Sequence, residues 1–253
     1  MKLTVLGSGT FMPELKRNNS SYLLEEGKEK IVFDFGRGAI DRLLQLKVNL
    51  IDLDKVFISH MHADHSSELI SFMFVLRYYP KKKDLKKHYY IYGPKGIKER
   101  LIMILDGFGV NKKKTLKRIK IKELSDNKIV KVGKLKIKAF TVKHSKSRTC
   151  FSYRVEKDKK AFCYSGDSTD CTGLRMACKD VDLAVVESTL PKSYGMDTHI
   201  NGEELGKLAQ EVGIHSLLVT HVSDFYLPRV LKDIKLSYKG PVKIAKDLME
   251  VKI

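Results

Sequence analysis

The stretch Ser59-His60-Met61-His62-Ala63-Asp64-His65 places three histidines and an aspartate within six residues. It follows Lys55–Ile58, an apolar segment with a strand pattern, so we expect the cluster to lie in a loop where that strand ends. Loops held by rigid elements commonly carry binding and catalytic side chains. Tight spacing with only small or apolar residues in between is typical of a metal site rather than of a chance surface cluster.

The spacing within this loop predicts two metal positions. Residues two apart on extended backbone point the same way, so His60 and His62 can bind one ion. The chain must then turn into a helix that the pattern starts near Glu68, and this turn directs Asp64 and His65 towards a neighbouring position. We therefore expect two adjacent metal ions.

Strand and helix patterns alternate along the rest of the chain. Strands are predicted at Leu3–Leu6, Tyr22–Leu24, Ile31–Phe33, Val56–Ile58, Cys150–Val155, Ala161–Tyr164, Leu183–Val186 and Leu217–Val219. Helices are predicted at Ala39–Leu46, Glu68–Tyr79, Gly96–Leu105, Gly202–Val212 and Pro228–Leu236. Alternating apolar and polar residues from Leu116 to His144 predict hairpin strands with one solvated face.

This order of elements indicates a mixed α/β fold. No repeat, low-complexity tract or linker divides the sequence, so we expect one domain over residues 1–253. Strand meanders separated by single helices, twice over, favour two sheets packed face to face with helices outside, which is a four-layer αββα sandwich.

The composition argues against redox and membrane functions. The four cysteines (Cys150, Cys163, Cys171 and Cys178) lack CxxC spacing, so we expect reduced thiols in a cytoplasmic protein. No apolar run is long enough for a signal peptide or a membrane span, which predicts a soluble protein without a membrane partner.

The formal charge of +18 suits a polyanionic partner such as RNA. Lysines gather at residues 81–83 with 86–87, and at residues 112–114 with Lys117 and Arg118. Such runs also arise as solvated faces, so the charge alone leaves nucleic-acid binding open.

The pattern HxHxDH, followed by a later His, a Gly-Asp and a final His, resembles the metallo-β-lactamase superfamily. The later positions are His144 after Lys136–Val142, Asp167 in Ser165-Gly166-Asp167-Ser168, and His221 after Leu217-Leu218-Val219-Thr220. The resemblance implies that His60, His62 and His144 hold one metal ion. It also implies that Asp64, His65 and His221 hold the other and that Asp167 bridges the two.

The resemblance implies a metal-dependent hydrolase with two divalent ions. Mixed imidazole and carboxylate ligands predict Zn²⁺, and Mn²⁺ or Fe²⁺ would also suit them. Two ions about 3.5–4 Å apart share a water, lower its pKa and clamp the attacking and leaving oxygens of a phosphate. In this family Asp64 would lie beside that water, and we expect it to orient the water or take its proton.

The opening Leu6-Gly7-Ser8-Gly9-Thr10 and the later Arg17-Asn18-Asn19-Ser20-Ser21 resemble ribonuclease Z, the tRNA 3′-processing endonuclease. Three further segments resemble the same branch, so the likeness covers nearly the whole chain: Phe33-Asp34-Phe35-Gly36, Tyr92-Gly93-Pro94-Lys95-Gly96 and Phe151-Ser152-Tyr153-Arg154.

That branch also places a glutamate after a strand and a catalytic histidine before a helix. Glu187 and His199 occupy those places, which implies that His199 protonates the leaving oxygen. The alternative is that His199 merely precedes the helix at Gly202, and Ile200-Asn201 replaces the family's usual Ser-Thr.

One departure from ribonuclease Z affects the predicted substrate. The long Gly- and Pro-rich arm that grips tRNA is missing, because only a short hairpin turn joins the strands between Tyr153 and Tyr164. We therefore predict an arm-less phosphodiesterase for a small or flexible phosphodiester, such as a cyclic nucleotide or a short RNA. A ribonuclease Z-type tRNA 3′-processing endoribonuclease is the alternative.

Two further alternatives are a carbon-centred hydrolase of a thioester, lactone or β-lactam, and a nucleic-acid-binding module with a structural metal site. Structural zinc sites are usually closed and Cys-rich, which disfavours the module. The family implies a homodimer. Arg148 closely follows His144, where a guanidinium would suit either a phosphate or an ion pair with a surface carboxylate.

Overall fold

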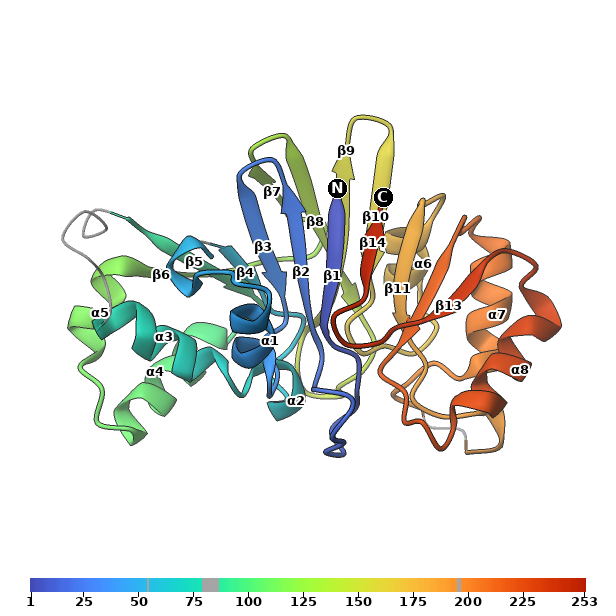
Figure 1. The fold of residues 1–253 in the computed structure, drawn as a ribbon, viewed down its shortest axis with the longest axis horizontal. Helices are drawn as coiled ribbons and strands as arrows, with labels where there is room; N and C mark the ends of the chain where they lie inside the picture. The colour runs from blue at the N-terminus through green and yellow to red at the C-terminus, as the bar shows by residue number, and fades with distance from the viewer. Residues whose placement is uncertain (54, 79–86, 195–196) are drawn as a thin grey trace.

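Two seven-stranded sheets form the centre of the protein (Figure 1). The structure is a computed structural model and describes residues 1–53, 55–78, 87–194 and 197–253. The first sheet has the strand order β14-β1-β2-β3-β4-β5-β6 and the second the order β13-β12-β11-β10-β9-β8-β7. Strands β1 and β14 pair with each other, so the two chain termini lie side by side.

The strands of the first sheet are β1 (Lys2–Gly7), β2 (Ser21–Glu26), β3 (Glu29–Phe33), β4 (Lys55–Phe57), β5 (Tyr89–Gly93), β6 (Ile119–Glu123) and β14 (Glu250–Lys252). Those of the second are β7 (Ile129–Val132), β8 (Leu135–Val142), β9 (Cys150–Lys157), β10 (Lys160–Tyr164), β11 (Leu183–Glu187), β12 (Leu217–Thr220) and β13 (Val242–Ile244). The helices are α1 (Ala39–Gln45), α2 (Ala63–Ser66), α3 (Leu69–Tyr78), α4 (Ile97–Gly107), α5 (Lys112–Arg118), α6 (Thr172–Cys178), α7 (Gly202–Glu211) and α8 (Leu227–Ser237). Short 3₁₀ turns lie at Leu50–Asp52 and Lys192–Tyr194.

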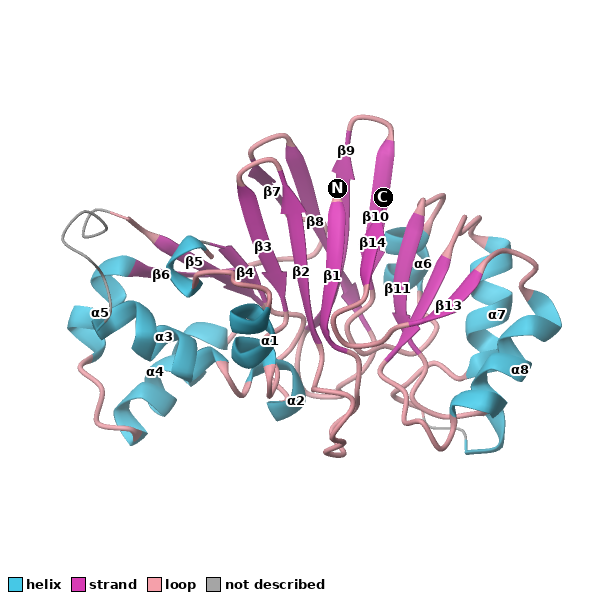
Figure 2. Ribbon diagram, viewed as in Figure 1, coloured by secondary structure: helices cyan, strands magenta, loops and turns pink. Residues whose placement is uncertain are grey.

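Three apolar clusters hold the layers together. Between the sheets, Phe33 contacts Phe162 and Phe57 contacts Tyr153, with ring centroids 5.8 and 5.5 Å apart. A second cluster joins the first sheet to α1, α3 and α4, and a third joins the second sheet to α6, α7 and α8. The helices therefore cover the two outer faces (Figure 2), and the predicted four-layer αββα sandwich is confirmed.

The predicted strands and helices are present, with ends that differ by at most two residues. The last residue of the predicted helix Glu68–Tyr79 lies outside the described residues. The prediction of hairpin strands throughout Leu116–His144 is wrong in its first part. There, Asn111 caps α5 by accepting a hydrogen bond from the Lys114 amide, and β6 pairs in parallel with β5 instead of forming a hairpin. Only β7 and β8 form the expected antiparallel pair.

The second lysine run lies on α5, where Lys112, Lys113, Lys114 and Lys117 are exposed. Most of the first run lies outside the described residues. Among the described helices, none combines the length and the apolar character that a membrane crossing requires.

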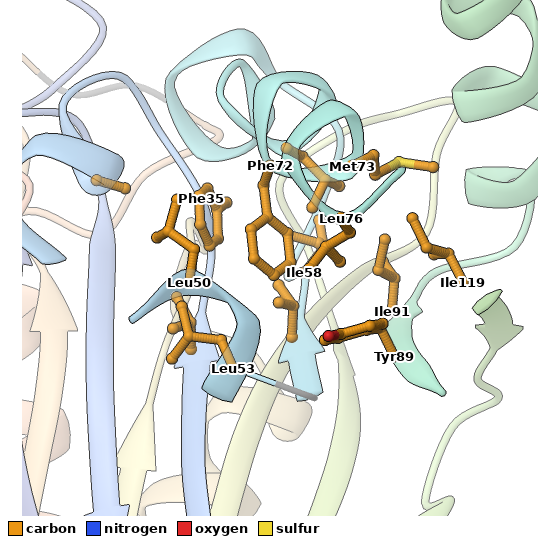
Figure 3. Packing of buried hydrophobic residues seen from close by; sticks show 14 of the residues in the cluster. Phe35, Leu50, Leu53, Ile58, Phe72, Met73, Leu76, Tyr89, Ile91 and Ile119 are labelled. Carbon is orange, nitrogen blue, oxygen red and sulfur yellow. The ribbon is translucent and has the colours of Figure 1, made fainter. Parts of the chain in front are cut away.

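Phe35 connects the first sheet to the loop that carries the histidine cluster. Its amide donates to the carbonyl of His65 at 2.7 Å, and its carbonyl accepts from the amide of Glu68 at 3.1 Å. The ring stacks on Phe72 of α3 with centroids 4.9 Å apart, inside the cluster drawn in Figure 3. Phe35 therefore fixes the loop through two backbone hydrogen bonds and through the stacking of its ring on α3.

Candidate metal centre

All seven predicted ligands lie at the carboxyl ends of strands on one edge of the two sheets. Residues 60–65 follow β4 and enter α2, a short helix over Ala63–Ser66 that the sequence did not predict; the helix predicted from Glu68 is α3, which begins at Leu69. His144 follows β8, Asp167 follows β10 and His221 follows β12. Convergence of strand ends from both sheets brings together residues far apart in sequence.

His60, His62 and His144 form the first cluster. The Nδ1 atom of His62 lies 2.9 Å from Nε2 of His60 and 3.1 Å from Nε2 of His144. Nitrogen ligands around a tetrahedral zinc ion are roughly 3.3 Å apart, because each Zn–N bond is about 2.0–2.1 Å. The three imidazoles are therefore spaced like ligands of one ion.

Asp64, His65 and His221 form the second cluster. Oδ2 of Asp64 lies 3.2 Å from Nε2 of His221 and 3.5 Å from Nε2 of His65. His65 and His221 are buried, whereas Asp64 is partly open to solvent.

Asp167 lies between the clusters and presents one oxygen to each. Its Oδ2 is 3.8 Å from Nε2 of His60 and 3.7 Å from that of His144. Its Oδ1 is 3.2 Å from Nε2 of His65 and 3.6 Å from that of His221. A single carboxylate thus faces two groups of nitrogen atoms, the arrangement required of a bridging ligand.

In four of the histidines, Nδ1 of the imidazole contacts an oxygen atom of a neighbouring residue. Nδ1 contacts Ser59 Oγ in His60 (3.0 Å), Asp34 Oδ2 in His65 (2.6 Å), the Thr198 carbonyl in His144 (2.9 Å) and Thr189 Oγ1 in His221 (2.8 Å). In each case Nδ1 carries the proton, because Ser59 and Thr189 donate their own hydroxyl protons to Asp34 and Glu187. Nε2 therefore faces the site, where it can bind a metal ion once it carries no proton.

Two buried atoms in the centre have no hydrogen-bond partner among the described residues. They are Nε2 of His65 and Oδ1 of Asp167, which are 3.2 Å apart without the geometry of a hydrogen bond. Buried polar atoms are rarely left unpaired, and a divalent cation would satisfy both. The residues present thus fit a pair of metal ions.

Charges inside the site change its protonation in the metal-free protein. Burial alone would raise the pKa of Asp167, but the imidazoles of His221 and His65 hold it well below the usual range. Burial would lower the pKa of His65, yet the carboxylates of Asp167 and Asp34 raise it well above the usual value. Negative charge from the carboxylates therefore favours a positive charge at the position that a metal ion would take.

Asp34 has a role that the sequence did not assign. It is fully buried, and Oδ2 accepts hydrogen bonds from Ser59 Oγ, His65 Nδ1 and Tyr164 OH at 2.6, 2.6 and 2.5 Å. Oδ1 accepts from the Ser59 amide at 2.6 Å. The available signal was its place in Phe33-Asp34-Phe35-Gly36, where a left-handed φ of 55° turns the chain directly after β3.

His199 lies beside both clusters. Its ring centroid is 4.8 Å from that of His144 and 5.9 Å from that of His221. Nδ1 contacts Glu187 Oε1 at 2.8 Å. Burial alone would lower the pKa of His199, but Glu187 raises it to about 9. His199 does not cap the following helix, since Asn201 caps α7 with Glu204 in a capping box.

Comparison with known proteins shows which family the chain belongs to. The family model described as "Anti-Pycsar protein Apyc1" matches residues 1–237. Ribonuclease Z of Methanosarcina acetivorans is 23% identical, and the alignment covers 100% of this chain and 98% of that protein.

Solved structures share the fold. The metallo-β-lactamase fold protein YhfI from Bacillus subtilis is 23% identical, with a TM-score of 0.85 and 99% of both chains covered. The short form of human tRNase Z is 22% identical, with a TM-score of 0.79 and coverage of 100% of this chain and 99% of that one.

The fold, the relatives and the two histidine and aspartate clusters identify a ribonuclease Z-like, metal-dependent hydrolase of the metallo-β-lactamase superfamily. Within that superfamily, the match over residues 1–237 shows that the chain belongs to the family of the anti-Pycsar protein Apyc1.

Proposed function

We propose that this hydrolase is a phosphodiesterase that uses two divalent metal ions, with zinc as the metal. His60, His62 and His144 would hold one ion, Asp64, His65 and His221 the other, and Asp167 both. The observation that carries this proposal is the position of Asp167, whose two oxygens face separate clusters. Bound in this way, the ions would lower the pKa of a water molecule and neutralise charge on the phosphate.

Two side chains would handle protons. Asp64 is partly open to solvent at the edge of the second cluster, where it can orient a water molecule and accept its proton. His199 lies beside His144 and His221, and its contact with Glu187 favours the protonated imidazole. A protonated His199 would donate its proton to the leaving oxygen of the diester.

The missing arm supports a small or flexible substrate, such as a cyclic nucleotide or a short RNA. Only Asp158 and Lys159 lie between β9 and β10. The alignment with the Methanosarcina ribonuclease Z spans 309 positions against 253 residues here, so at least 56 positions of that alignment have no residue of this chain. Without an arm, a folded tRNA would have to be held by scattered surface lysines, whose attraction is screened by salt.

Turnover of bis(p-nitrophenyl) phosphate and of a precursor tRNA by the metal-loaded protein would test the proposal. We expect the small diester to be hydrolysed and the tRNA to be left uncut at physiological salt. Accurate cleavage after the discriminator base would support the second candidate, a tRNA 3′-processing endoribonuclease. Failure on both, with hydrolysis of a thioester or lactone, would overturn the phosphodiesterase proposal.

A homodimer is the assembly that we propose. A groove of about 910 Å³ lies between α3 and α4 next to Met61 of the metal loop. Phe74, Met103 and Phe108 line it with exposed fractions of 47%, 63% and 70%. Large exposed apolar side chains gathered in one groove are typical of a protein interface.

Light scattering would test this assembly. The double variant Phe74→Ser/Met103→Ser should be monomeric, whereas Leu236→Ser, which changes an exposed leucine on α8, should remain dimeric. A monomeric wild-type protein at micromolar concentration would refute the dimer.

A further inference from the structure

Two cysteines outside the metal centre lie against each other in the core. Cys163 belongs to β10, and Cys178 is the last residue of α6. Their Sγ atoms are 3.1 Å apart, and both side chains are fully buried. The proposed reaction uses neither thiol, so the close approach of the two sulfur atoms is independent of the catalytic chemistry.

The backbone on both sides of Cys178 is held next to Cys163. Arg154 of β9 is the cross-strand neighbour of Cys163, so the two side chains leave the sheet on the same face. Nη1 of Arg154 donates hydrogen bonds to the carbonyl oxygens of Ala177 and Lys179, at 3.3 and 2.5 Å. Since these residues precede and follow Cys178, one guanidinium fixes the end of α6 beside Cys163.

The other end of α6 also lies close to the sheet. A Cβ atom at Gly173 would overlap the carbonyl oxygen of Thr141 on β8, so only glycine permits this approach. Between the two ends, Leu174 is fully buried against the same sheet. Because α6 is fixed along its length, the fold itself sets the short separation between Cys178 and Cys163.

A shared metal ion does not fit this pair of cysteines. Two thiolates on one tetrahedral zinc ion are roughly 3.8 Å apart, because each Zn–S bond is about 2.3 Å. Within the described ranges, neither cysteine belongs to a group of three or more potential ligands. A hydrogen bond between two thiols is weak. Two buried sulfur atoms held this close are instead well placed for a covalent bond.

We propose that Cys163 and Cys178 form an intramolecular disulfide that joins β10 to α6. The oxidant is a low-molecular-weight disulfide such as oxidised glutathione. The thiolate of one cysteine attacks it and releases one reduced glutathione, and the thiolate of the second cysteine then displaces the other. The two cysteines together lose two electrons and two protons. The sequence predicted reduced thiols because CxxC spacing is absent, but cysteines 15 positions apart meet here through the packing of β10 and α6.

The surroundings of the pair favour a stable bond over a readily exchanged one. The hydrogen bond with Cys163, together with burial, raises the pKa of the Cys178 thiol well above its usual value, which disfavours the thiolate in the folded protein. Thiol–disulfide exchange requires a thiolate and access to it. We therefore expect the bond to form while the chain folds or opens locally, and to resist reductants in the folded protein.

The disulfide would close a ring that contains Asp167, the carboxylate that faces both clusters. A cross-link between residues 15 positions apart stabilises a protein mainly by restricting its unfolded chain. The oxidised protein should therefore unfold at a higher temperature than the reduced protein. This inference does not depend on the proposed phosphodiesterase function.

Thiol counting and peptide mapping test the bond directly. The metal-loaded protein is incubated with reduced and oxidised glutathione just below its unfolding temperature, where local opening gives access to buried thiols, and is then denatured. Protein kept in tris(2-carboxyethyl)phosphine should show all four cysteines free. After glutathione, we expect two free thiols and a digest in which Cys163 is linked to Cys178. Four free thiols, mixed disulfides with glutathione, or links through Cys150 or Cys171 would overturn the proposal.

Thermal unfolding measures the effect of the bond. The oxidised wild type should unfold roughly 5–10 °C above the reduced wild type. Cys178→Ala should abolish this difference, whereas Cys171→Ala, at the half-buried cysteine that precedes α6, should keep it. The readout compares two redox states of one protein, so the packing cost of a substitution cancels. Equal midpoints for the two states of the wild type would contradict the cross-link, and peptide mapping of the wild type decides the question even if Cys178→Ala does not fold.

Discussion

Nδ1 of His65 and the carboxylate of Asp34 are 2.6 Å apart, and both side chains are fully buried. The contact fixes the direction of Nε2 in His65, and Asp34 also holds Ser59, which in turn contacts Nδ1 of His60. One buried carboxylate therefore orients a histidine of each cluster, so its effects should appear as changes in metal affinity.

Asp34→Asn should weaken metal binding by about 10- to 100-fold, because an amide cannot replace the charged acceptor behind His65. Calorimetric titration of the metal-free protein measures the affinity, and thermal unfolding checks that the variant folds. Asp158→Asn is a matched control, since Asp158 also has a left-handed φ (53°) but lies exposed in the β9–β10 turn. Unchanged affinity in a folded Asp34→Asn variant would contradict this role.

Asp64→Asn should lower kcat for bis(p-nitrophenyl) phosphate by about 10²-fold or more, because the variant loses the group that accepts a proton from water. The measurement is made at saturating metal, with metal content determined alongside. Asp52→Asn, at an exposed position remote from the clusters, should behave like the wild type. Near-normal turnover by Asp64→Asn would show that the reaction does not require this carboxylate.

His199→Ala should slow turnover to an extent that depends on the leaving group of the substrate. Nitrophenolate leaves without a proton, so turnover of bis(p-nitrophenyl) phosphate should fall by less than about tenfold. A nucleoside alcohol needs a proton, so hydrolysis of a dinucleotide should fall by about 10²-fold or more. Equal losses for both substrates would show that His199 positions other groups instead of donating a proton.

Metal uptake should release protons. The carboxylates of Asp167 and Asp34 raise the pKa of His65 in the metal-free protein, which favours its protonated form, and that form must lose a proton to bind a cation. Metal affinity should therefore fall as the pH is lowered from 8 towards 6. Calorimetry in buffers of different ionisation enthalpy counts the protons, and binding heats that do not depend on the buffer would contradict the expectation.

Much of the fold followed from local sequence patterns, because apolar runs such as Leu217–Val219 and periodic segments such as Gly202–Val212 match buried strands and amphipathic helices. The elements that were missed are strands β5, β13 and β14 and helices α2, α5 and α6. Tyr89–Gly93 alternates buried and half-buried aromatic residues without a clear polar face, and α6 is only seven residues long. The misplaced β6 shows that periodicity does not identify a strand's partner.

The grouping of candidate ligands followed from spacing and resemblance, and the structure brings all seven together as expected. Their roles as metal ligands, the single domain and the cytoplasmic location stay predictions. The supporting contacts could not be predicted, because Tyr164 and Asp34 are 130 residues apart and meet only through the packing of the two sheets. Nor could spacing indicate that His62 presents Nδ1 where its neighbours present Nε2.

Titration of metal-free protein with Zn²⁺, following bis(p-nitrophenyl) phosphate turnover, tests the two-metal phosphodiesterase most directly. The account predicts no turnover without metal and a rise that saturates at about two equivalents per chain, since Asp167 faces two clusters. Turnover by rigorously metal-free protein, or saturation at about one equivalent, would contradict it.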